Sequence, residues 1–354
     1  MIFTTHRIII DAAQSMHQLK DESIQLVVTS PPYPMIEMWD SSFASQNPII
    51  ETALKNSDAQ LAFEQMHIEL DKVWFELSRV VVAGGFVCVN IGDATRSVNQ
   101  QFALYSNHSR IITAFTKLGF VNLPNILWRK QTNAPNKFMG SGMLPAGAYV
   151  TLEHEWILIF RKGNKPDFKT QTEKLKRKQS AYFWNERNAW FSDVWDLKGI
   201  RQIIHKNANK TSNKNIRNRS AAFPFEIPYR LINMYSLQGD TILDPFLGTA
   251  TTMVAAIAAN RNSIGFEIES DFSNIIIENI LSVPLAFYNK VIQNRIESQQ
   301  QFIESNQNRE FKHYNKNLNL PVMTNQETEI LFRYIKEITT KENENQNEVY
   351  AVYR

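Results

Sequence analysis

Two short segments, far apart in the chain, carry residue types whose spacing suits ligand chemistry. The first, Ser30-Pro31-Pro32-Tyr33, combines a hydroxyl group, backbone carbonyl groups and an aromatic ring. Proline fixes φ and keeps the preceding residue extended, so carbonyl groups such as that of Pro31 are free to face a cleft. Seen alone, the segment is equally consistent with an ordinary rigid loop.

The second segment runs from Asp244 to Thr252 and reads DPFLGTATT. Gly248 permits a tight turn that a ligand can approach closely, and the helix expected after it starts with unpaired N–H groups. Glu267 ends the next predicted strand, nineteen residues after Gly248. A carboxylate at that place accepts hydrogen bonds from both hydroxyls of a ribose. Because the chain has no Gly-Lys-Ser/Thr loop, the pattern indicates a nucleotide-like ligand without a triphosphate.

The elements that must position these segments alternate along the chain. Apolar, β-branched runs predict strands at 24–29, 86–91, 120–128, 155–160, 241–243 and 263–268. Helical spacing of apolar residues predicts helices at 60–82, 109–118, 227–237 and 251–260. This alternation predicts an α/β fold, with a mostly parallel sheet and helices on both faces.

Other segments are expected to be irregular. The polar stretch 41–58 reads as a loop or mobile segment, and Ala83-Gly84-Gly85 reads as a turn. After about residue 290 the chain is polar, with one helix predicted at 325–338 and a frayed tail from Lys341.

Charge is unevenly distributed. Residues 161–220 contain sixteen Lys or Arg against five Asp or Glu, a local net charge of +11 in a chain whose net charge is +3. A basic segment in an acidic body is typical of a nucleic-acid contact region, and a solvated loop is the alternative. Trp184, Trp190 and Trp195 are expected to form a small core within this region.

Composition sets the broad class. With 43% hydrophobic residues the chain can bury a sizeable core, and its single cysteine, Cys88, excludes an internal disulfide or a cysteine-based zinc cluster. No metal site is expected. The apolar run 8–10 is too short for a signal sequence, and no stretch is long enough to span a membrane, so a cytoplasmic protein is expected.

Together the two segments resemble those of the amino-group DNA methyltransferases, which modify cytosine N4 or adenine N6. The order resembles the β group, a circular permutation in which the catalytic loop precedes the S-adenosyl-L-methionine loop. The resemblance covers roughly residues 1–280 and implies a Rossmann-like methyltransferase sheet with an inserted target-recognition region. The implied divisions are a catalytic half (1–160), a basic target-recognition region (161–220), a cofactor-binding half (221–290) and a polar C-terminal extension (291–354).

The resemblance also implies the site. The catalytic residues are Ser30, Pro31, Pro32 and Tyr33. The residues expected to bind S-adenosyl-L-methionine are Asp11, Phe223, Asp244, Pro245, Phe246, Gly248, Thr249, Thr251 and Glu267. Ile10 stands where the family usually has glycine, and Ala222 where proline is commoner. Ala250 replaces a second glycine, and because alanine needs an ordinary φ, the loop is expected to differ locally.

The chemistry implied by the resemblance starts from a poor nucleophile, an amino group whose lone pair is delocalised into the base. Ser30 and the Pro31 carbonyl group are expected to accept its hydrogens, and Tyr33 to stack on a base flipped out of the duplex. Methylation at cytosine C5 needs a thiolate, and Cys88 reads as a packed, inert thiol inside a strand. Serine at position 30 favours cytosine N4 over adenine N6.

Alternatives remain open at this point. The same fold acts on RNA or on a glutamine amide in other enzymes, although Ser30 and the long basic region favour double-stranded DNA. A catalytically dead, nucleic-acid-binding scaffold is a further alternative. The sequence does not decide whether a cognate restriction endonuclease accompanies the protein, or whether the protein forms a homodimer.

Overall fold

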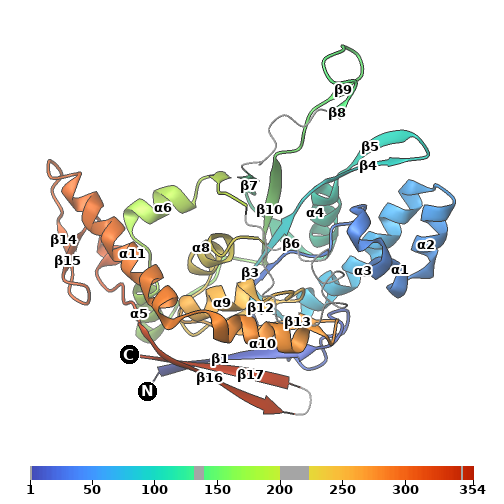
Figure 1. Cartoon of the computed structure of the whole chain (residues 1–354). Coiled ribbons are helices and arrows are strands. Elements are labelled where there is room, and N and C mark those ends of the chain that lie inside the picture. The colour runs from blue at the N-terminus through green and yellow to red at the C-terminus, as the bar shows by residue number, and fades with distance from the viewer. Residues whose placement is uncertain (1, 131–138, 200–222, 344–345) are drawn as a thin grey trace.

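The computed structural model describes residues 2–130, 139–199, 223–343 and 346–354 (Figure 1). The basic residues predicted to contact nucleic acid between 200 and 220 therefore lie outside the described residues. A central sheet of eleven strands has the order β11-β7-β10-β3-β2-β12-β13-β1-β17-β16, with β6 beside β10. The segments 30–33 and 244–252 both lie at ends of strands in this sheet.

The five central strands are parallel. They are β3 (Val81–Ile91), β2 (Ile24–Thr29), β12 (Thr241–Asp244), β13 (Asn262–Glu267) and β1 (Ile2–Ile10). Their side chains alternate between two apolar cores, so that Leu26 and Val28 face one core and Val27 the other. Strands buried on both faces read as continuous apolar runs, which is why the sequence predicted β2, β3, β12 and β13. Of β1, whose residues 4–7 are polar, the sequence showed only the apolar run 8–10.

Helices cover both faces of the sheet. On one face lie α3 (Ala59–Val80) and α4 (Asn107–Lys117), and on the other α8 (Glu226–Tyr235), α9 (Thr251–Ala258) and α10 (Phe272–Ser282). This arrangement confirms the predicted α/β fold, with a mostly parallel sheet and helices on both faces. Within the described part of the chain, no single helix is long and apolar enough to cross a membrane; α10 and α11 (Leu285–Glu304), bent by 57°, meet that test only as a pair.

The order of the strands creates a crevice between β2 and β12. The chain leaves β2 for β3 on one side, and leaves β12 for β13 on the other. In open α/β sheets, ligands bind outside the carboxyl ends of strands at such a switch point. Both segments singled out in the sequence begin there, Ser30 after β2 and Pro245 after β12.

The predicted loop at 41–58 is wrong, because this stretch forms α1 (Asp40–Gln46) and α2 (Pro48–Lys55). The Asn47 side chain accepts a hydrogen bond from the Ile49 N–H, and Pro48 occupies the first turn. Asparagine followed by proline is a helix-start signal that the polar composition concealed. Ile50 is fully buried and anchors α2.

The predicted turn at Ala83-Gly84-Gly85 is also wrong, because β3 runs through it with an irregular register against β2. Gly84 has φ +81°, and a Cβ atom on Gly85 would lie 3.0 Å from the Gln25 carbonyl oxygen. The glycines therefore allow a bulge and a close strand approach.

The strand predicted at 120–128 is interrupted. It divides into β6 (Phe120–Asn122) and β7 (Ile126–Arg129), which both pair with β10 (His154–Lys162). Strand β10 is antiparallel to β3, β6 and β7, so the central run of parallel strands ends at β3. The edge strand β11 is parallel to β7.

The C-terminal predictions fail as well. Instead of a helix at 325–338 the structure has the 3-10 turn η2 (Asn325–Glu327) and the start of β16 (Ile335–Asn343). The tail is not frayed, because β17 (Gln346–Tyr353) pairs antiparallel with β1 along its whole length. Val349, Ala351 and Tyr353 are buried. The extension completes the sheet, and the two ends of the chain lie side by side (Figure 1).

The described part of the basic region contains α5 (Gln171–Gln179), α6 (Trp184–Trp190) and β11 (Val194–Asp196). Trp190 and Trp195 are buried, as expected for core residues, whereas Trp184 is half-buried against Phe302. The division of the chain into four regions stays a prediction.

Short elements complete the description. They are η1 (Glu37–Trp39) and the hairpins β4 (Ala94–Val98) with β5 (Gln101–Tyr105), β8 (Met139–Gly140) with β9 (Ala148–Tyr149), and β14 (His313–Asn315) with β15 (Leu320–Val322).

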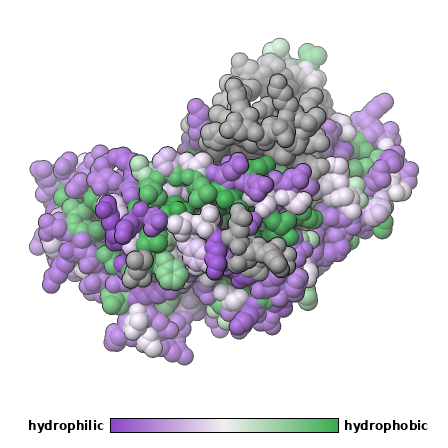
Figure 2. Space-filling model, turned by 60° about the horizontal axis from the view of Figure 1, so that its bottom comes forward, coloured by the Kyte–Doolittle hydropathy of each residue, from purple (hydrophilic) through white to green (hydrophobic). Residues whose placement is uncertain are grey.

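On the face shown in Figure 2, hydrophobic side chains gather towards the middle and hydrophilic ones surround them.

Candidate active site

One pocket at the carboxyl ends of β2, β12 and β13 brings the two sequence segments together. The residues predicted as catalytic or cofactor-binding all line it: Asp11, Ser30, Pro31, Pro32, Tyr33, Phe223, Asp244, Pro245, Phe246, Gly248, Thr249, Thr251 and Glu267. Residues separated by more than two hundred positions thus share one cavity. The pocket establishes their proximity, while the role of each side chain stays a prediction.

Asp244 joins the two loops. One carboxylate oxygen accepts from the Thr29 hydroxyl group at 2.6 Å, and the other from the Thr252 hydroxyl group at 2.6 Å. The Phe246 N–H adds a third hydrogen bond at 3.1 Å. Burial raises the pKa of Asp244 to about 6, although these hydrogen bonds oppose the shift. The carboxylate therefore holds the strand end before Ser30 against the loop that contains Gly248.

Glu267 lies at the end of β13 and faces the same loop. The Gly248 N–H donates to one carboxylate oxygen at 2.9 Å, and the Glu269 N–H to the other at 3.1 Å. Burial raises the pKa of Glu267 to about 7, and the negative charges of Glu269 and Asp244 add to the rise. The site therefore keeps a half-buried carboxylate whose charge is electrostatically costly and can be compensated by hydrogen-bond donors.

Asp11 enters the pocket from the end of β1. Its backbone N–H donates to the Glu267 carbonyl oxygen at 3.0 Å, which places the two acidic residues on adjacent strand ends. Its carboxylate accepts from the Ala12 N–H and from the Gln18 side chain, each at 2.8 Å. Ile10, which stands where glycine is usual, pairs with Glu267 in the sheet and leaves Asp11 in the pocket lining.

The loop between β12 and α9 corrects the expectation for Ala250. Gly248 has φ +52° and Ala250 has φ +69°, so both are left-handed. Ala250 is fully buried, and its N–H donates to the Leu247 carbonyl oxygen at 2.9 Å. Alanine thus adopts the left-handed conformation that glycine adopts more easily, which contradicts the expectation of an ordinary φ at this position.

Tyr33 is held by polar groups that the sequence did not single out. Its hydroxyl oxygen lies 2.8 Å from a Glu155 carboxylate oxygen and 3.2 Å from the Ser30 hydroxyl oxygen. The Asn90 amide nitrogen lies 2.8 Å from the tyrosine hydroxyl oxygen and 2.7 Å from Glu155. Lys130 forms an ion pair with the other oxygen of Glu155. Burial, followed by the charge of Glu155, raises the pKa of Tyr33 well above its usual range.

The ring of Tyr33 is held as firmly as its hydroxyl group. A Cβ atom on Gly92 would lie 2.9 Å from the Tyr33 ring, so a glycine is required beneath it. Sequence reasoning missed Asn90, Lys130 and Glu155 as site residues. The available signal was a charged residue, Glu155, directly before the apolar run 156–160, since buried charges are rare without partners.

The position of Cys88 bears on the expectation of an inert thiol. Cys88 is buried in the core, and burial raises the pKa of its thiol, which agrees with an inert, packed cysteine. Among the residues that the structure describes, no group of three or more His, Cys, Asp or Glu could hold a metal ion.

The chain is similar to known DNA methyltransferases. A family described as DNA methylase, comprising N6 and N4 methyltransferases, matches residues 24–278. The Type II methyltransferase M.MthZI of Methanothermobacter thermautotrophicus is 51% identical over 333 residues, which cover 94% of this chain and 91% of the relative. M.MjaI of Methanocaldococcus jannaschii is 50% identical over 290 residues, which cover 79% and 92%.

A solved structure is also similar. TTHA0409 of Thermus thermophilus, described as a putative DNA modification methylase and crystallised with S-adenosyl-L-methionine, has a TM-score of 0.59 and 28% sequence identity. The similarity covers 78% of this chain and 93% of the Thermus chain.

Proposed function

The chain belongs to the N6 and N4 family of DNA methylases, and from this premise we propose that it methylates N4 of a flipped cytosine in double-stranded DNA. S-adenosyl-L-methionine is its methyl donor. The observation that carries the proposal is the single pocket lined by Ser30, Pro31, Gly248 and Glu267. The choice of cytosine N4 over adenine N6 rests on Ser30, the residue type that the resemblance associates with N4 enzymes.

The residues present suit the methyl donor. The Glu267 carboxylate would accept both ribose hydroxyls, and its raised pKa marks it as an acceptor whose burial a ligand can compensate. Asp11 would face the adenine, Phe223 the methionine side, and the turn at Gly248 would let the ligand approach the backbone. When bound, S-adenosyl-L-methionine supplies a methyl group on a sulfonium centre.

The catalytic loop would then activate the amino group. The Ser30 hydroxyl oxygen and the Pro31 carbonyl oxygen each accept a hydrogen bond from the amino group. These two hydrogen bonds draw the nitrogen towards tetrahedral geometry and free its lone pair. Orientation and hydrogen bonding at pre-placed acceptors carry most of the rate enhancement. The ring of Tyr33 provides the stacking face for the flipped base, a contact worth roughly 1–3 kcal/mol.

The partner is double-stranded DNA. The basic region would supply phosphate contacts from Lys and Arg, and some of its Arg, Asn or Gln would read base edges. Because the relatives are Type II methyltransferases, we place the reaction in a restriction-modification system with a cognate restriction endonuclease. A cytoplasmic location follows from a DNA substrate, and a homodimer is an arrangement that the proposal allows.

The identity of the product tests the proposal. The protein is incubated with unmethylated duplex DNA and S-adenosyl-L-methionine, and the DNA is digested to nucleosides for mass spectrometry. We expect N4-methylcytosine. N6-methyladenine in its place would overturn the choice of base while leaving the fold and the methyl donor intact.

Tyr33→Ala tests the catalytic loop separately. We expect it to lose most methylation activity while binding of S-adenosyl-L-methionine persists, because the ring contacts the base and not the donor. Activity near that of the wild type would remove Tyr33 from the stacking role.

A further inference from the structure

Four polar side chains beside the catalytic loop form a chain of hydrogen bonds whose direction can be deduced. They are Lys130, Glu155, Asn90 and Tyr33, and the chain ends on the Ser30 hydroxyl group. Glu155 is buried, and each of its carboxylate oxygens faces a donor. An ionised carboxylate only accepts hydrogen bonds, and a lysine ammonium only donates them. These two facts fix the position of every hydrogen that follows.

The tyrosine hydroxyl group has a single hydrogen. At 2.8 Å from a carboxylate oxygen that can only accept, this hydrogen belongs to the contact with Glu155. The Asn90 amide group must direct its NH2 towards Tyr33 and Glu155, because its carbonyl oxygen would otherwise face the carboxylate. Tyr33 therefore donates once, to Glu155, and its oxygen is left to accept.

The contact between Ser30 and Tyr33 then has one direction. Its oxygen–oxygen distance is 3.2 Å, and the hydrogen of Tyr33 is already used. The Ser30 O–H must donate to the Tyr33 oxygen, which leaves the lone pairs of the serine oxygen available to the pocket. An amino group donates hydrogens, and this direction leaves both serine lone pairs available to accept one of them.

We propose that Glu155 is a positioning residue that acts through Tyr33 to keep the Ser30 hydroxyl group oriented as an acceptor for the substrate amino group. If Tyr33 instead donated to Ser30, it would occupy one of the two serine lone pairs, and the serine hydrogen would be free to turn towards the incoming amino group and compete with it. The inference rests on the proposed function of the catalytic loop. It adds the polarity of the hydrogen-bond chain, that is, the direction of donation from Ser30 to Tyr33 and from Tyr33 to Glu155. It applies equally to a cytosine or an adenine amino group.

Glu155→Gln is expected to remove this fixed direction without changing the shape of the side chain. Lys130 would retain the amide oxygen, since an NH2 group facing an ammonium group is unfavourable. The amide NH2 group would then face the Tyr33 oxygen and the Asn90 NH2 group, so Asn90 must turn its amide oxygen towards it. The tyrosine hydrogen, no longer held by a carboxylate, is shared between the Asn90 oxygen and Ser30, and the Ser30 hydroxyl group is no longer held as a donor to Tyr33. We expect kcat to fall by about tenfold to a hundredfold, as for a mismatched buried hydrogen bond. The Kd for S-adenosyl-L-methionine should change by less than about twofold.

In the E155Q variant, removing the Tyr33 hydroxyl hydrogen, which can then point towards Ser30, should restore activity. Tyr33→Phe alone keeps the ring and is expected to cost only a few-fold in kcat. The double variant Y33F/E155Q should be faster than E155Q and close to Y33F. A purely structural role for Glu155 predicts the opposite, a double variant no faster than the slower single variant. A double variant slower than E155Q, or E155Q with wild-type kcat, would overturn the inference.

A second pair of substitutions tests the same direction. In K130M/E155Q the amide group has no ammonium neighbour, so its oxygen can turn to the Tyr33 hydroxyl group and restore the original polarity. We expect this pair to retain kcat within about tenfold of the wild type, and it replaces E155Q if the single variant does not fold. A pair as slow as E155Q, or inactive, contradicts the argument.

The matched control is Glu186→Gln. Glu186 is a buried glutamate held by Arg295 through both oxygens, at 2.5 and 2.8 Å, and it lies outside the pocket lining. Its loss is expected to lower stability and to leave kcat unchanged. Nucleoside analysis of the wild-type product, run in parallel, separates the two hypotheses: N6-methyladenine would defeat the proposed base but not the polarity, whereas the variant series tests the polarity alone.

Discussion

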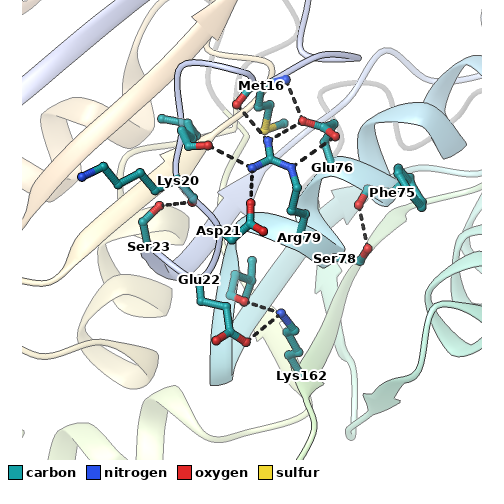
Figure 3. A network of polar contacts seen from close by, with 12 residues as sticks. Met16, Lys20, Asp21, Glu22, Ser23, Phe75, Glu76, Ser78, Arg79 and Lys162 are labelled. Carbon is teal, nitrogen blue, oxygen red and sulfur yellow. Dashed lines mark hydrogen bonds and ion pairs between the residues drawn. The ribbon is translucent and has the colours of Figure 1, made fainter.

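Carboxylates at the two ends of the parallel strands differ in their partners and in the direction of their pKa shifts. At the carboxyl ends, Asp244 and Glu267 accept hydrogen bonds from hydroxyl and N–H groups, and burial raises the pKa of each. At the amino ends, Arg79 closes an ionic network with Glu76 and Asp21, each at 2.7 Å (Figure 3). There the hydrogen bond from Arg79 lowers the pKa of Glu76.

The Arg79 network ties the chain together where it enters the sheet. Besides the two carboxylates, Arg79 donates to the carbonyl oxygens of Met16 and Leu19, each at 2.9 Å, and Glu76 accepts from the Met16 N–H at 2.8 Å. Lys162 makes a similar link nearby, to Glu22 and to the Val81 carbonyl oxygen (Figure 3). Donors and acceptors are matched within the protein at this end, whereas the acids at the pocket end are compensated less completely. The difference identifies which end is built for stability and which for a ligand.

The largest effect is expected from Glu267→Gln. The amide group loses the negative charge and presents a donor where both ribose hydroxyls need an acceptor. Charge-assisted hydrogen bonds of this kind contribute about 1.5–3 kcal/mol, so the Kd for S-adenosyl-L-methionine should rise by about ten- to a hundredfold in isothermal titration calorimetry. Glu76→Gln is the matched control, and its Kd should equal that of the wild type. Equal losses in both variants would erase the distinction between the two ends.

Arg79→Met should do the reverse. It removes the cation and the donors for two carbonyl groups while keeping an unbranched side chain. We expect the free energy of unfolding to fall by roughly 1–3 kcal/mol in urea titrations. The affinity for S-adenosyl-L-methionine should be unchanged, because Arg79 lies at the amino ends of the strands. An unaltered unfolding free energy would place this network among the surface ion pairs that contribute nothing.

The pH dependence should also differ between the ends. Glu267 has a raised pKa of about 7 in the folded protein, so its burial opposes folding increasingly as the pH rises from its ordinary pKa towards 7. A ligand whose hydroxyl groups donate hydrogen bonds to Glu267 favours the ionised carboxylate. The affinity for S-adenosyl-L-methionine should therefore increase by up to about tenfold between pH 6 and 8. Glu267→Gln should abolish this rise.

Glu76 has the opposite sign. Its pKa is lowered in the folded protein, so the stability that it contributes is present above its ordinary pKa and is lost as the pH falls through the folded value. Urea titrations of wild type and Glu76→Gln between pH 3 and 6 should converge at the acidic end. Curves that stay parallel would show that Glu76 is not the group being titrated.

Much of the site could be predicted because its information is local. Ser30 and Gly248 lie in segments whose residue types indicate the chemistry. The apolar strands directly before these segments indicate that both lie at the carboxyl ends of strands. Asn90, Lys130 and Glu155 could not be found in this way, because they come from three different strands or strand ends and meet only in the folded sheet. A hydrogen-bond chain between distant strands leaves no spacing pattern in the sequence.

The fold shows the same limit. Continuous apolar strands in the centre were predicted, whereas β17, second from the edge of the sheet, was missed because its surroundings are polar. The alternation of Val349, Ala351 and Tyr353 was present, but these residues reach the apolar core only when β17 joins the sheet between β1 and β16. Such a strand owes its structure to its neighbours, so propensity alone is weak evidence for it.

The smallest expected effect concerns Ala250, whose left-handed backbone the sequence did not predict. Alanine in this conformation costs roughly 1–2 kcal/mol, which glycine would recover. Glycine also removes a buried methyl group and loosens the unfolded chain, at a cost of about 1 kcal/mol. Ala250→Gly should therefore change the free energy of unfolding by less than about 1 kcal/mol. Ala255→Gly is the matched control, because Ala255 is equally buried but lies inside α9.

In the control, glycine relieves no strain and also lowers helix propensity, so Ala255→Gly should destabilise by roughly 1–2 kcal/mol. The difference between the two variants measures the strain stored at the turn beside Gly248. Equal destabilisation would mean that the left-handed turn costs nothing, and that the second glycine of this loop is exchangeable for reasons other than backbone tolerance. A larger loss for Ala250→Gly would instead show that its methyl group is needed to pack the pocket end of the sheet, where the acids are least compensated.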